Sequence, residues 1–297
     1  MQKVARANRC SLRQHAWCYT HNGLCPLFGS SVAADIEVAG LPCIDFSKAG
    51  KRLGPEGPHA KVFVAHAKRH VELATPVIVI ENVWELSIPM IEKLYGNHYD
   101  IHPLYCKTDD TGHSAASRDR VYVVLVHQQR AVMTLDIKSL YDRVAGKIRN
   151  LVRTEVSDYL VAGRWEILRE AQDLARRRML DLLTERERKA VSWASQHYQK
   201  KFGRPAARDK HLVLQLRDSP PKYLCWSAVS RKLPTMRLGS HLCWHFRTSR
   251  LMTAREHLCS LGFPVTAETA LSMGVPMLPV KDSKRANHLA GNAMHFS

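Results

Sequence analysis

A cysteine, Cys43, lies where a short predicted strand gives way to a loop. Apolar side chains alternate over residues 35–39, and Gly40 then breaks the alternation. Pro42 has a fixed φ angle and biases the residue before it toward an extended backbone. Since the chain enters the turn already constrained, we expect the Cys43 thiol to face a cleft, which is the position of a nucleophile.

Two further groups could work with that thiol. An apolar run over residues 76–80 ends in Glu81, and a later strand contains Arg118 and Arg120, which alternate and therefore point to the same face. A carboxyl group can protonate a ring nitrogen while a thiolate attacks the ring, and nearby arginines favour the thiolate. Taken alone, these residues would be an exposed carboxylate and two arginines in salt bridges.

Five short motifs occur in one order over residues 35–297. They are G-x-P-C-x-x-F-S around Cys43, Glu81-Asn82-Val83, Ser117-Arg118-Asp119-Arg120, Thr253-Ala254-Arg255-Glu256 with Leu261-Gly262-Phe263-Pro264, and Gly291-Asn292-Ala293. Together they resemble the motifs of the cytosine-C5 DNA methyltransferases. The family usually has Gln two residues before the first arginine of the third motif, where this chain has Ala116.

The resemblance implies a DNA (cytosine-5)-methyltransferase, which transfers a methyl group from S-adenosylmethionine to C5 of cytosine. In that reaction Cys43 forms a covalent adduct with C6 while Glu81 assists at N3. By resemblance, Arg120 reaches the base O2 and Arg118 supports the loop. The target cytosine is flipped out of double-stranded DNA, because a stacked base cannot be attacked.

The loop after Cys43 is rich in glycine, proline and positive charge. In the family this loop closes over the DNA, and its basic side chains could position the duplex through its phosphates. The predicted substrate-binding residues are Pro42, Ser47, Asn82, Lys48, Lys51 and Arg52.

Cofactor binding is the incomplete part of the resemblance. We expect Asn292 and Val62 at the edge of the S-adenosylmethionine pocket. The family also uses a Phe-x-Gly-x-Gly turn, whose glycines let the backbone approach the ligand, and acidic residues after the next two strands. None of the 42 residues before Cys43 forms that turn. Either the chain is a fragment or its cofactor pocket is incomplete.

Two alternatives therefore stay open beside a DNA methyltransferase. The first is an inactive or fragmentary relative that only binds nucleic acid. The second is an RNA cytosine-C5 methyltransferase, because one branch of the family acts on structured RNA. Cofactor binding by the isolated protein would discriminate the first alternative from an enzyme.

The element pattern predicts an α/β fold, with a doubly wound, mainly parallel, Rossmann-like sheet and a smaller, helix-rich, basic recognition domain. We expect an N-terminal extension over 1–34, part of the catalytic domain over 35–135, a target-recognition region over 136–250, and a return to the catalytic domain over 251–297.

Some elements can be placed more closely. Residues 60–73 predict a helix with Val62, Val64 or Ala65, and Leu73 turned inward, and residues 90–106 predict a helix, a turn and a strand. Thr184 and Thr253 each stand three residues before a glutamate, which predicts two capping boxes.

The formal charge of +17 and the pI near 9.7 predict attraction to polyanions. Residues 191–250 hold 12 Lys or Arg against 2 Asp or Glu, interleaved with aromatic side chains. We expect this stretch to form a surface that grips nucleic acid and to dominate DNA affinity. The aromatic residues are Trp193, Tyr198, Tyr223, Trp226, Trp244 and Phe246.

The eight cysteines are scattered, which favours reduced thiols in an intracellular protein. We expect it in the nucleus, with an organelle as the alternative, and no membrane partner, because no apolar run approaches about 18 residues. The spacing predicts no metal in two sets of Cys and His. One set is Cys10, His15, Cys18, His21 and Cys25, and the other is Cys225, His241, Cys243 and His245.

Overall fold

The computed structural model describes most of the chain as two compact units. The first unit comprises Met1–Cys106 and Asp119–Arg143, and the second comprises Lys107–Arg118 and Val144–Ser297. Residues 251–297, which the sequence assigns to the catalytic domain, thus cluster with the second unit. The described residues are 2, 4, 9, 11–26, 34–47, 50–175, 183–217, 219–236 and 242–292, with the backbone alone for 172–175 and 292.

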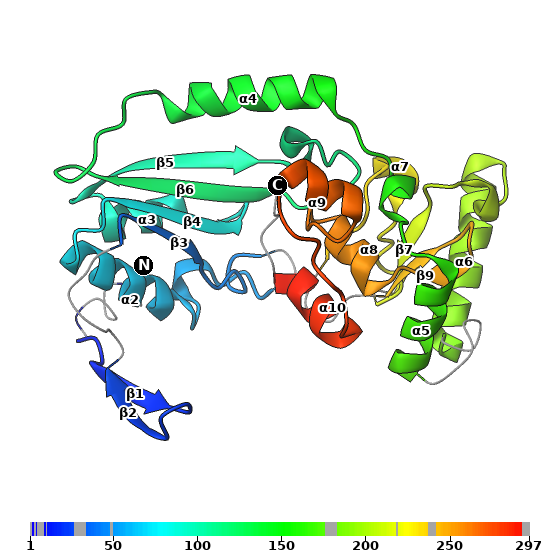
Figure 1. The fold of residues 1–297 in the computed structure, drawn as a ribbon, viewed down its shortest axis with the longest axis horizontal. Coiled ribbons are helices and arrows are strands. Elements are labelled where there is room, and N and C mark those ends of the chain that lie inside the picture. The colour runs from blue at the N-terminus through cyan, green and yellow to red at the C-terminus, as the bar shows by residue number, and fades with distance from the viewer. Residues whose placement is uncertain are drawn as a thin grey trace. The chain divides into compact units, whose positions relative to one another are not determined.

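A four-stranded sheet forms the centre of the first unit, in the order β3-β4-β6-β5 (Figure 1). The β3–β4 pair is parallel, whereas β6 is antiparallel to both of its neighbours. Three strands therefore run in one direction and β6 runs against them, so that β6 begins at the edge where β3 and β4 end. The strands are β3 (Ile36–Gly40), β4 (Val77–Val83), β5 (Tyr99–Cys106) and β6 (Arg120–His127).

Two helices, α2 (Ala60–Glu72) and α3 (Ile88–Tyr95), cover one face of this sheet (Figure 1). Ile78 and Ile80 of β4 are fully buried against them, opposite Leu125 and Val123 of β6. Burying each such side chain contributes roughly 1.5–3 kcal/mol. The predicted helix is confirmed. Its buried apolar residues are Ala60, Phe63, Val64 and Ala67, so the inward positions expected for Val62 and Leu73 were wrong.

A short hairpin of β1 (His15–Cys18) and β2 (Gly23–Pro26) precedes the sheet. The loop after β3 contains one turn of 3-10 helix, η1 (Gly54–Glu56).

The second unit contains a small antiparallel sheet, in the order β7-β8-β9, among several helices. Helix α4 begins in the first unit and ends in the second. The elements are η2 (Thr108–Thr111), α4 (Ile137–Leu151), η3 (Val156–Tyr159), α5 (Arg164–Ala175), α6 (Glu185–Phe202), η5 (Ala206–Arg208), β7 (Val213–Gln215), α7 (Ser227–Ser230), β8 (Cys243–His245), β9 (Arg250–Leu251), α8 (Ala254–Cys259), α9 (Ala267–Met273) and α10 (Ser283–Asn292).

The aromatic residues of the basic stretch do not line a charged surface. Tyr198, Trp244 and Phe246 are buried, and Trp193 and Trp226 pack against the same cluster, which joins α6 to the small sheet. The expectation of aromatic side chains interleaved with charge on a surface was therefore wrong for these five. The apolar rings leave water, whereas the described Lys and Arg of the stretch stay outside the core, except for the buried Arg250. Tyr223 is the exception, with 65% of its surface exposed.

The remaining predictions for the fold agree with the structure. Both capping boxes are present, with Thr184 capping α6 and Thr253 capping α8. The helix, turn and strand expected over 90–106 correspond to α3 and β5. The α/β class is confirmed, with a mixed central sheet. Within the described residues, every helix is too short or too polar to cross a membrane.

Candidate active site

The chain turns sharply at Cys43, three residues after β3 ends. The backbone N–H groups of Phe46 and Ser47 both donate to the Cys43 carbonyl, at 3.0 and 2.8 Å. Cys43 is half-buried, whereas the next residue, Ile44, is 54% exposed. Phe46 points inward and packs edge-on against Phe63 of α2, with ring centroids 5.6 Å apart. The turn that presents the thiol is therefore anchored in the core.

Asp45 fixes the loop that follows. Its carbonyl accepts from the Gly54 N–H at 2.8 Å, and its buried Oδ2 accepts from the His59 N–H at 2.8 Å. A β-carbon on Gly57 would collide with the Asp45 carboxylate, and one on Gly50 with the Ile44 carbonyl. The glycines thus let the loop fold back against the Cys43 turn. Sequence reasoning missed Asp45, although its place two residues after the cysteine was a signal.

The end of β4 is bonded to the Cys43 turn through Asn82. The Asn82 Nδ2 donates to the Leu41 carbonyl at 2.9 Å, and the side chain is almost completely buried. Gly40 pairs with Glu81 in the parallel ladder. Since adjacent parallel strands end at the same edge, Cys43 and Glu81 come to one edge of the sheet. Asn82 therefore holds protein backbone, and its predicted contact with substrate stays a prediction.

Glu81 forms an ion pair with Arg120. The Arg120 Nε donates to Glu81 Oε1 at 2.8 Å, and its Nη1 donates to the Asp119 carbonyl at 2.8 Å. Both side chains are largely buried, with 12% and 15% of their surfaces exposed. A buried charge-assisted bond fixes the orientation of the carboxyl group.

Arg118 does not lie on the strand that carries Arg120. β6 begins at Arg120, where both partner strands end, because Arg120 pairs with Val83 and with Cys106. Arg118 belongs to the second unit, where it is 5% exposed and its Nη1 donates to the Met236 carbonyl at 3.4 Å. The expectation that the two arginines share a strand face was wrong, because β6 begins at Arg120, two residues later than the alternation suggested.

The other predicted site residues are distributed as follows. Pro42 and Ser47 lie in the Cys43 turn, Lys51 and Arg52 are exposed on the following loop, and Arg52 has a left-handed φ of 52°. Lys48 lies outside the described residues. Val62 is half-buried on α2. Asn292 ends α10, but its side chain is outside the described part of the chain.

An aromatic pair lies near the same edge of the sheet and was missed by sequence reasoning. Trp84 directly follows β4, and Tyr105 is the penultimate residue of β5. Their ring centroids are 4.8 Å apart, and the side chains are 37% and 41% exposed. Exposed aromatic faces can stack with nucleobases. The signal was an aromatic residue directly after Glu-Asn-Val.

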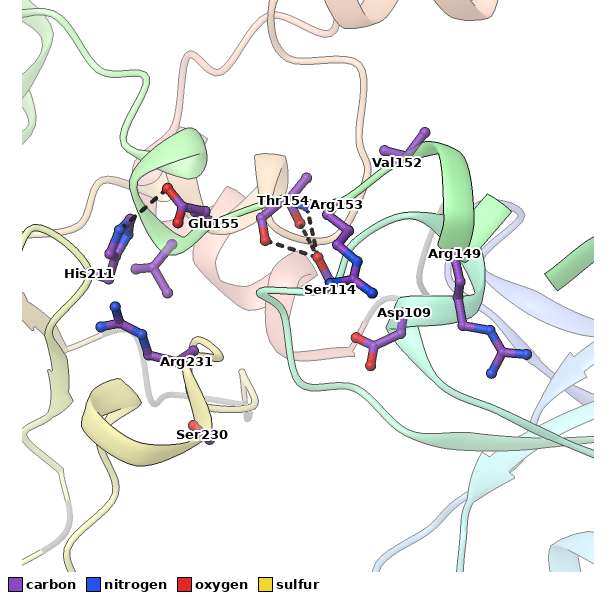
Figure 2. A pocket seen from close by; sticks show the side chains of 11 residues that line it. Asp109, Ser114, Arg149, Val152, Arg153, Thr154, Glu155, His211, Ser230 and Arg231 are labelled. Carbon is purple, nitrogen blue, oxygen red and sulfur yellow. Dashed lines mark hydrogen bonds and ion pairs between the residues drawn. The ribbon is translucent and has the colours of Figure 1, made fainter. Parts of the chain in front are cut away.

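A separate hollow of about 570 Å³ lies within the second unit (Figure 2). Two acidic residues of its lining form ion pairs with lysines that do not line it. Lys232 pairs with Asp109 at 2.8 Å, and Lys210 pairs with Glu155 at 3.3 Å. The arginines on its wall therefore make it a candidate phosphate contact. Its lining includes Arg149, Arg153, Arg231, His211, Ser114, Thr154 and Ser230.

Two groups of described residues have side-chain atoms close enough to hold a metal ion. One is Glu37, His66 and His70 of the first unit. Burial lowers the pKa of His66 to about 4 and also lowers the pKa of His70. His66 Nδ1 lies 2.7 Å from the Tyr95 hydroxyl and His70 Nδ1 lies 2.9 Å from that of Thr75, which gives these rings a packing role. The other group is in the β1–β2 hairpin.

Comparison with known proteins supplies the family. A family model described as C-5 cytosine-specific DNA methylase matches residues 29–273. No curated protein matches the sequence. The chain is similar to solved structures of the Entamoeba histolytica methyltransferase EhMeth (16% identity, 88% of this chain, 73% of that chain, TM-score 0.45) and of S. pombe Dnmt2 (16%, 88%, 74%, 0.44). A putative DNA modification methyltransferase from an E. coli prophage matches with 15% identity over 89% of this chain and 75% of that one, at a TM-score of 0.48.

The motifs at Cys43, Glu81 and Arg120 lie within the matched residues, which cover most of the chain. The chain belongs to the C-5 cytosine-specific DNA methylase family.

Proposed function

We propose that this chain acts as a DNA (cytosine-5)-methyltransferase through a covalent adduct between Cys43 and C6 of cytosine. One observation carries the proposal: the bond of 2.9 Å from Asn82 Nδ2 to the Leu41 carbonyl. It couples the turn that presents the thiol to the strand that presents the Glu81 carboxyl. A nucleophile and an acid held at one sheet edge are what addition to a pyrimidine needs.

The chemistry of the base explains why both groups are required. C6 of cytosine is a poor electrophile until N3 is protonated or strongly hydrogen-bonded. When the Cys43 thiolate forms a bond to C6, the π pair of the C5–C6 double bond shifts to form a C4–C5 double bond, and the π pair between C4 and N3 moves onto N3, which takes a proton from the Glu81 carboxyl. C5 then becomes the nucleophilic position. Once C5 has gained a methyl group, loss of the C5 proton and of the thiolate restores the C5–C6 double bond.

Arg120 acts on this step through Glu81. Its Nε donates to Oε1 at 2.8 Å, which fixes the orientation of the carboxyl group. A carboxyl group that meets both N3 and the exocyclic amine favours cytosine over uracil. The predicted contact of Arg120 with the base O2 would use its remaining guanidinium hydrogens.

Nucleic acid binding is assigned mainly to the second unit. This unit carries 29 Lys or Arg against 15 Asp or Glu, whereas the first carries 15 against 12. Positive charge on this scale supports phosphate contacts, and the hollow beside Arg153 offers one place for them. Double-stranded DNA with a flipped cytosine is the substrate that we propose, and the nucleus is the corresponding location.

The described residues do not fit the methyl donor that the family generally uses, S-adenosylmethionine. β3 is the outer strand of the described sheet, and no described strand beside it ends in a glycine-rich turn. Val62 is half-buried on α2, so it offers apolar contact alone. This misfit favours a second candidate function, that of a relative that binds nucleic acid without turnover.

A covalent trap separates the two candidates. DNA containing 5-fluorocytosine retains the enzyme after methyl transfer, because fluorine cannot leave C5 as a proton does. We expect a stable protein–DNA complex with added S-adenosylmethionine and none without it. Binding of DNA with no trapped complex, and no calorimetric binding of S-adenosylmethionine, would instead establish the binding-only relative. Trapping on 5-fluorocytosine RNA but not on DNA would replace the proposed substrate.

A further inference from the structure

The β1–β2 hairpin gathers three metal-binding side chains that the methyltransferase chemistry does not use. Its strands pair in the register Ala16 with Cys25 and Cys18 with Gly23. Cys18 lies two residues from Ala16, so the thiols of Cys18 and Cys25 point to the same face of the hairpin. His21 lies in the turn between the strands and reaches the same place.

The atoms of these side chains are close together. His21 Nδ1 lies 3.5 Å from the Cys18 sulfur and 3.2 Å from the Cys25 sulfur. The three ligand atoms lie within 4.8 Å of one another. Tetrahedral zinc with bonds of about 2.3 Å to sulfur and about 2.0 Å to nitrogen would separate S and N by roughly 3.5 Å. The observed separations are therefore close to those of a zinc site.

Hydrogen bonding alone does not account for this arrangement. One imidazole nitrogen carries either one hydrogen or one lone pair, so Nδ1 of His21 can make a full bond with only one of its two thiol neighbours. A cation that replaces both thiol protons would satisfy all three groups at once.

The turn also directs backbone donors at the Cys18 sulfur, which accepts from the backbone N–H groups of His21 and Thr20. The sulfur is therefore held in one position beside His21.

The hairpin also needs a source of stability other than a core. Its opposite face shows Trp17 at 53% and Leu24 at 72% exposure, and Tyr19 in the turn is 91% exposed. A two-stranded hairpin without a buried face is marginal in water, and small folds of this kind depend on disulfides or metals. The cysteines of the hairpin are free thiols.

We propose that Cys18, His21 and Cys25 bind one zinc ion, with water in the fourth coordination position. Binding releases two thiol protons and orders the hairpin. The spacing C-x2-H-x3-C gave no reason to expect a metal. Cys25 comes to lie beside Cys18 only because the turn brings the second strand back against the first, and the spacing alone does not reveal that turn. The site is independent of Cys43 and of methyl transfer.

Metal content of the full chain tests the site directly. Purified protein, stripped of metal under reducing conditions and incubated with zinc chloride, should retain one zinc ion more than the Cys18→Ser and Cys25→Ser variants. The His15→Asn variant, which removes an exposed histidine of the same hairpin, should retain as much as the wild type. Cobalt should give thiolate charge-transfer absorption in the wild type and in His15→Asn.

The site is refuted if the wild type holds no more zinc than the double variant Cys18→Ser, Cys25→Ser. Loss of zinc in His15→Asn would refute the ligand set. Far-ultraviolet circular dichroism should show the same helix content in each variant, because the hairpin residues lie outside the core of the sheet. Protease cleavage within residues 15–26 should be slower with zinc than without it, and equal rates would contradict the ordering.

Discussion

The two units differ in where they place charge. The first unit is nearly balanced, at +3, and brings its reactive groups to one edge of a sheet, whereas the second carries +14. Polar groups inside the first unit hold a loop in place, as Asp45 and Asn82 do. Those inside the second hold helices, as the buried Arg250–Glu256 pair does. We propose from this difference that the first unit forms the covalent bond and that the second attracts the polyanion.

Removing the Glu81 carboxyl should abolish most of the methyl transfer and leave DNA binding by the second unit intact. For Glu81→Gln we expect methyl transfer to fall by about 10²–10⁴-fold, because an amide cannot supply the proton at N3. The DNA dissociation constant should change little. Glu85→Gln makes the same chemical change at an exposed position four residues later, and it is the control for effects that do not depend on Glu81. Equal activity of the two variants would remove Glu81 from the reaction.

The second unit should be most sensitive at its buried ion pair. Glu256 is completely buried, and its two oxygens accept from both terminal nitrogens of Arg250 at 2.7 Å. Glu256→Gln leaves a buried guanidinium without its counter-charge, and should lower the free energy of unfolding by about 3–5 kcal/mol. Chemical denaturation measures it. The exposed Glu268→Gln should cost less than about 1 kcal/mol, and similar losses in both would contradict the assignment.

A carboxyl group in the second unit should make stability depend on pH. Burial raises the pKa of Glu170 to about 7, although the Ala254 N–H donates to it. The folded state therefore keeps a proton that the unfolded state loses, so this contribution is present below about pH 4.5 and is lost as pH rises through 7. The loss is up to about 3 kcal/mol. Glu170→Gln should flatten the wild-type decline, and parallel pH profiles would refute the shift.

The smallest effect concerns the charge difference itself. The Arg153→Ala variant removes a charge from the lining of the hollow in the second unit. It should weaken DNA binding several-fold, and the plot of the logarithm of the DNA association constant against the logarithm of the salt concentration should become less steep by about 0.9. Arg143→Ala, at an exposed arginine of the first unit, should leave the slope unchanged. Fluorescence anisotropy over a salt series measures both. A larger change for Arg143 would reverse the assignment of the units.

The sequence predicted those site residues that directly follow the ends of adjacent strands. Cys43 and Glu81 each follow an apolar run, so their meeting at one edge required only that the strands be parallel neighbours. Arg118 was misplaced because a ladder ends where its partners end, which alternation does not reveal. Asp45 was missed because its partners Gly54 and His59 come from a loop that has no periodicity.

The aromatic residues of the second unit illustrate the same limit. Trp244 and Phe246 stand among cationic neighbours in sequence, yet they pack against α6 from more than 40 residues away. The composition of residues 191–250 is basic, as predicted. Which of its side chains are buried and which are exposed is decided by the fold. Likewise the spacing of Cys18, His21 and Cys25 became informative only when a turn brought them together.

The central claim is that the Cys43 thiol adds to C6 of cytosine beside Glu81. Addition makes C5 exchange its hydrogen with solvent, so release of tritium from DNA labelled at C5 of cytosine reads this step without any methyl donor. The wild-type chain alone should release tritium, and Cys43→Ala should release none while still binding the DNA. Equal release by both proteins, or none from the wild type under conditions in which it binds that DNA, would contradict the account.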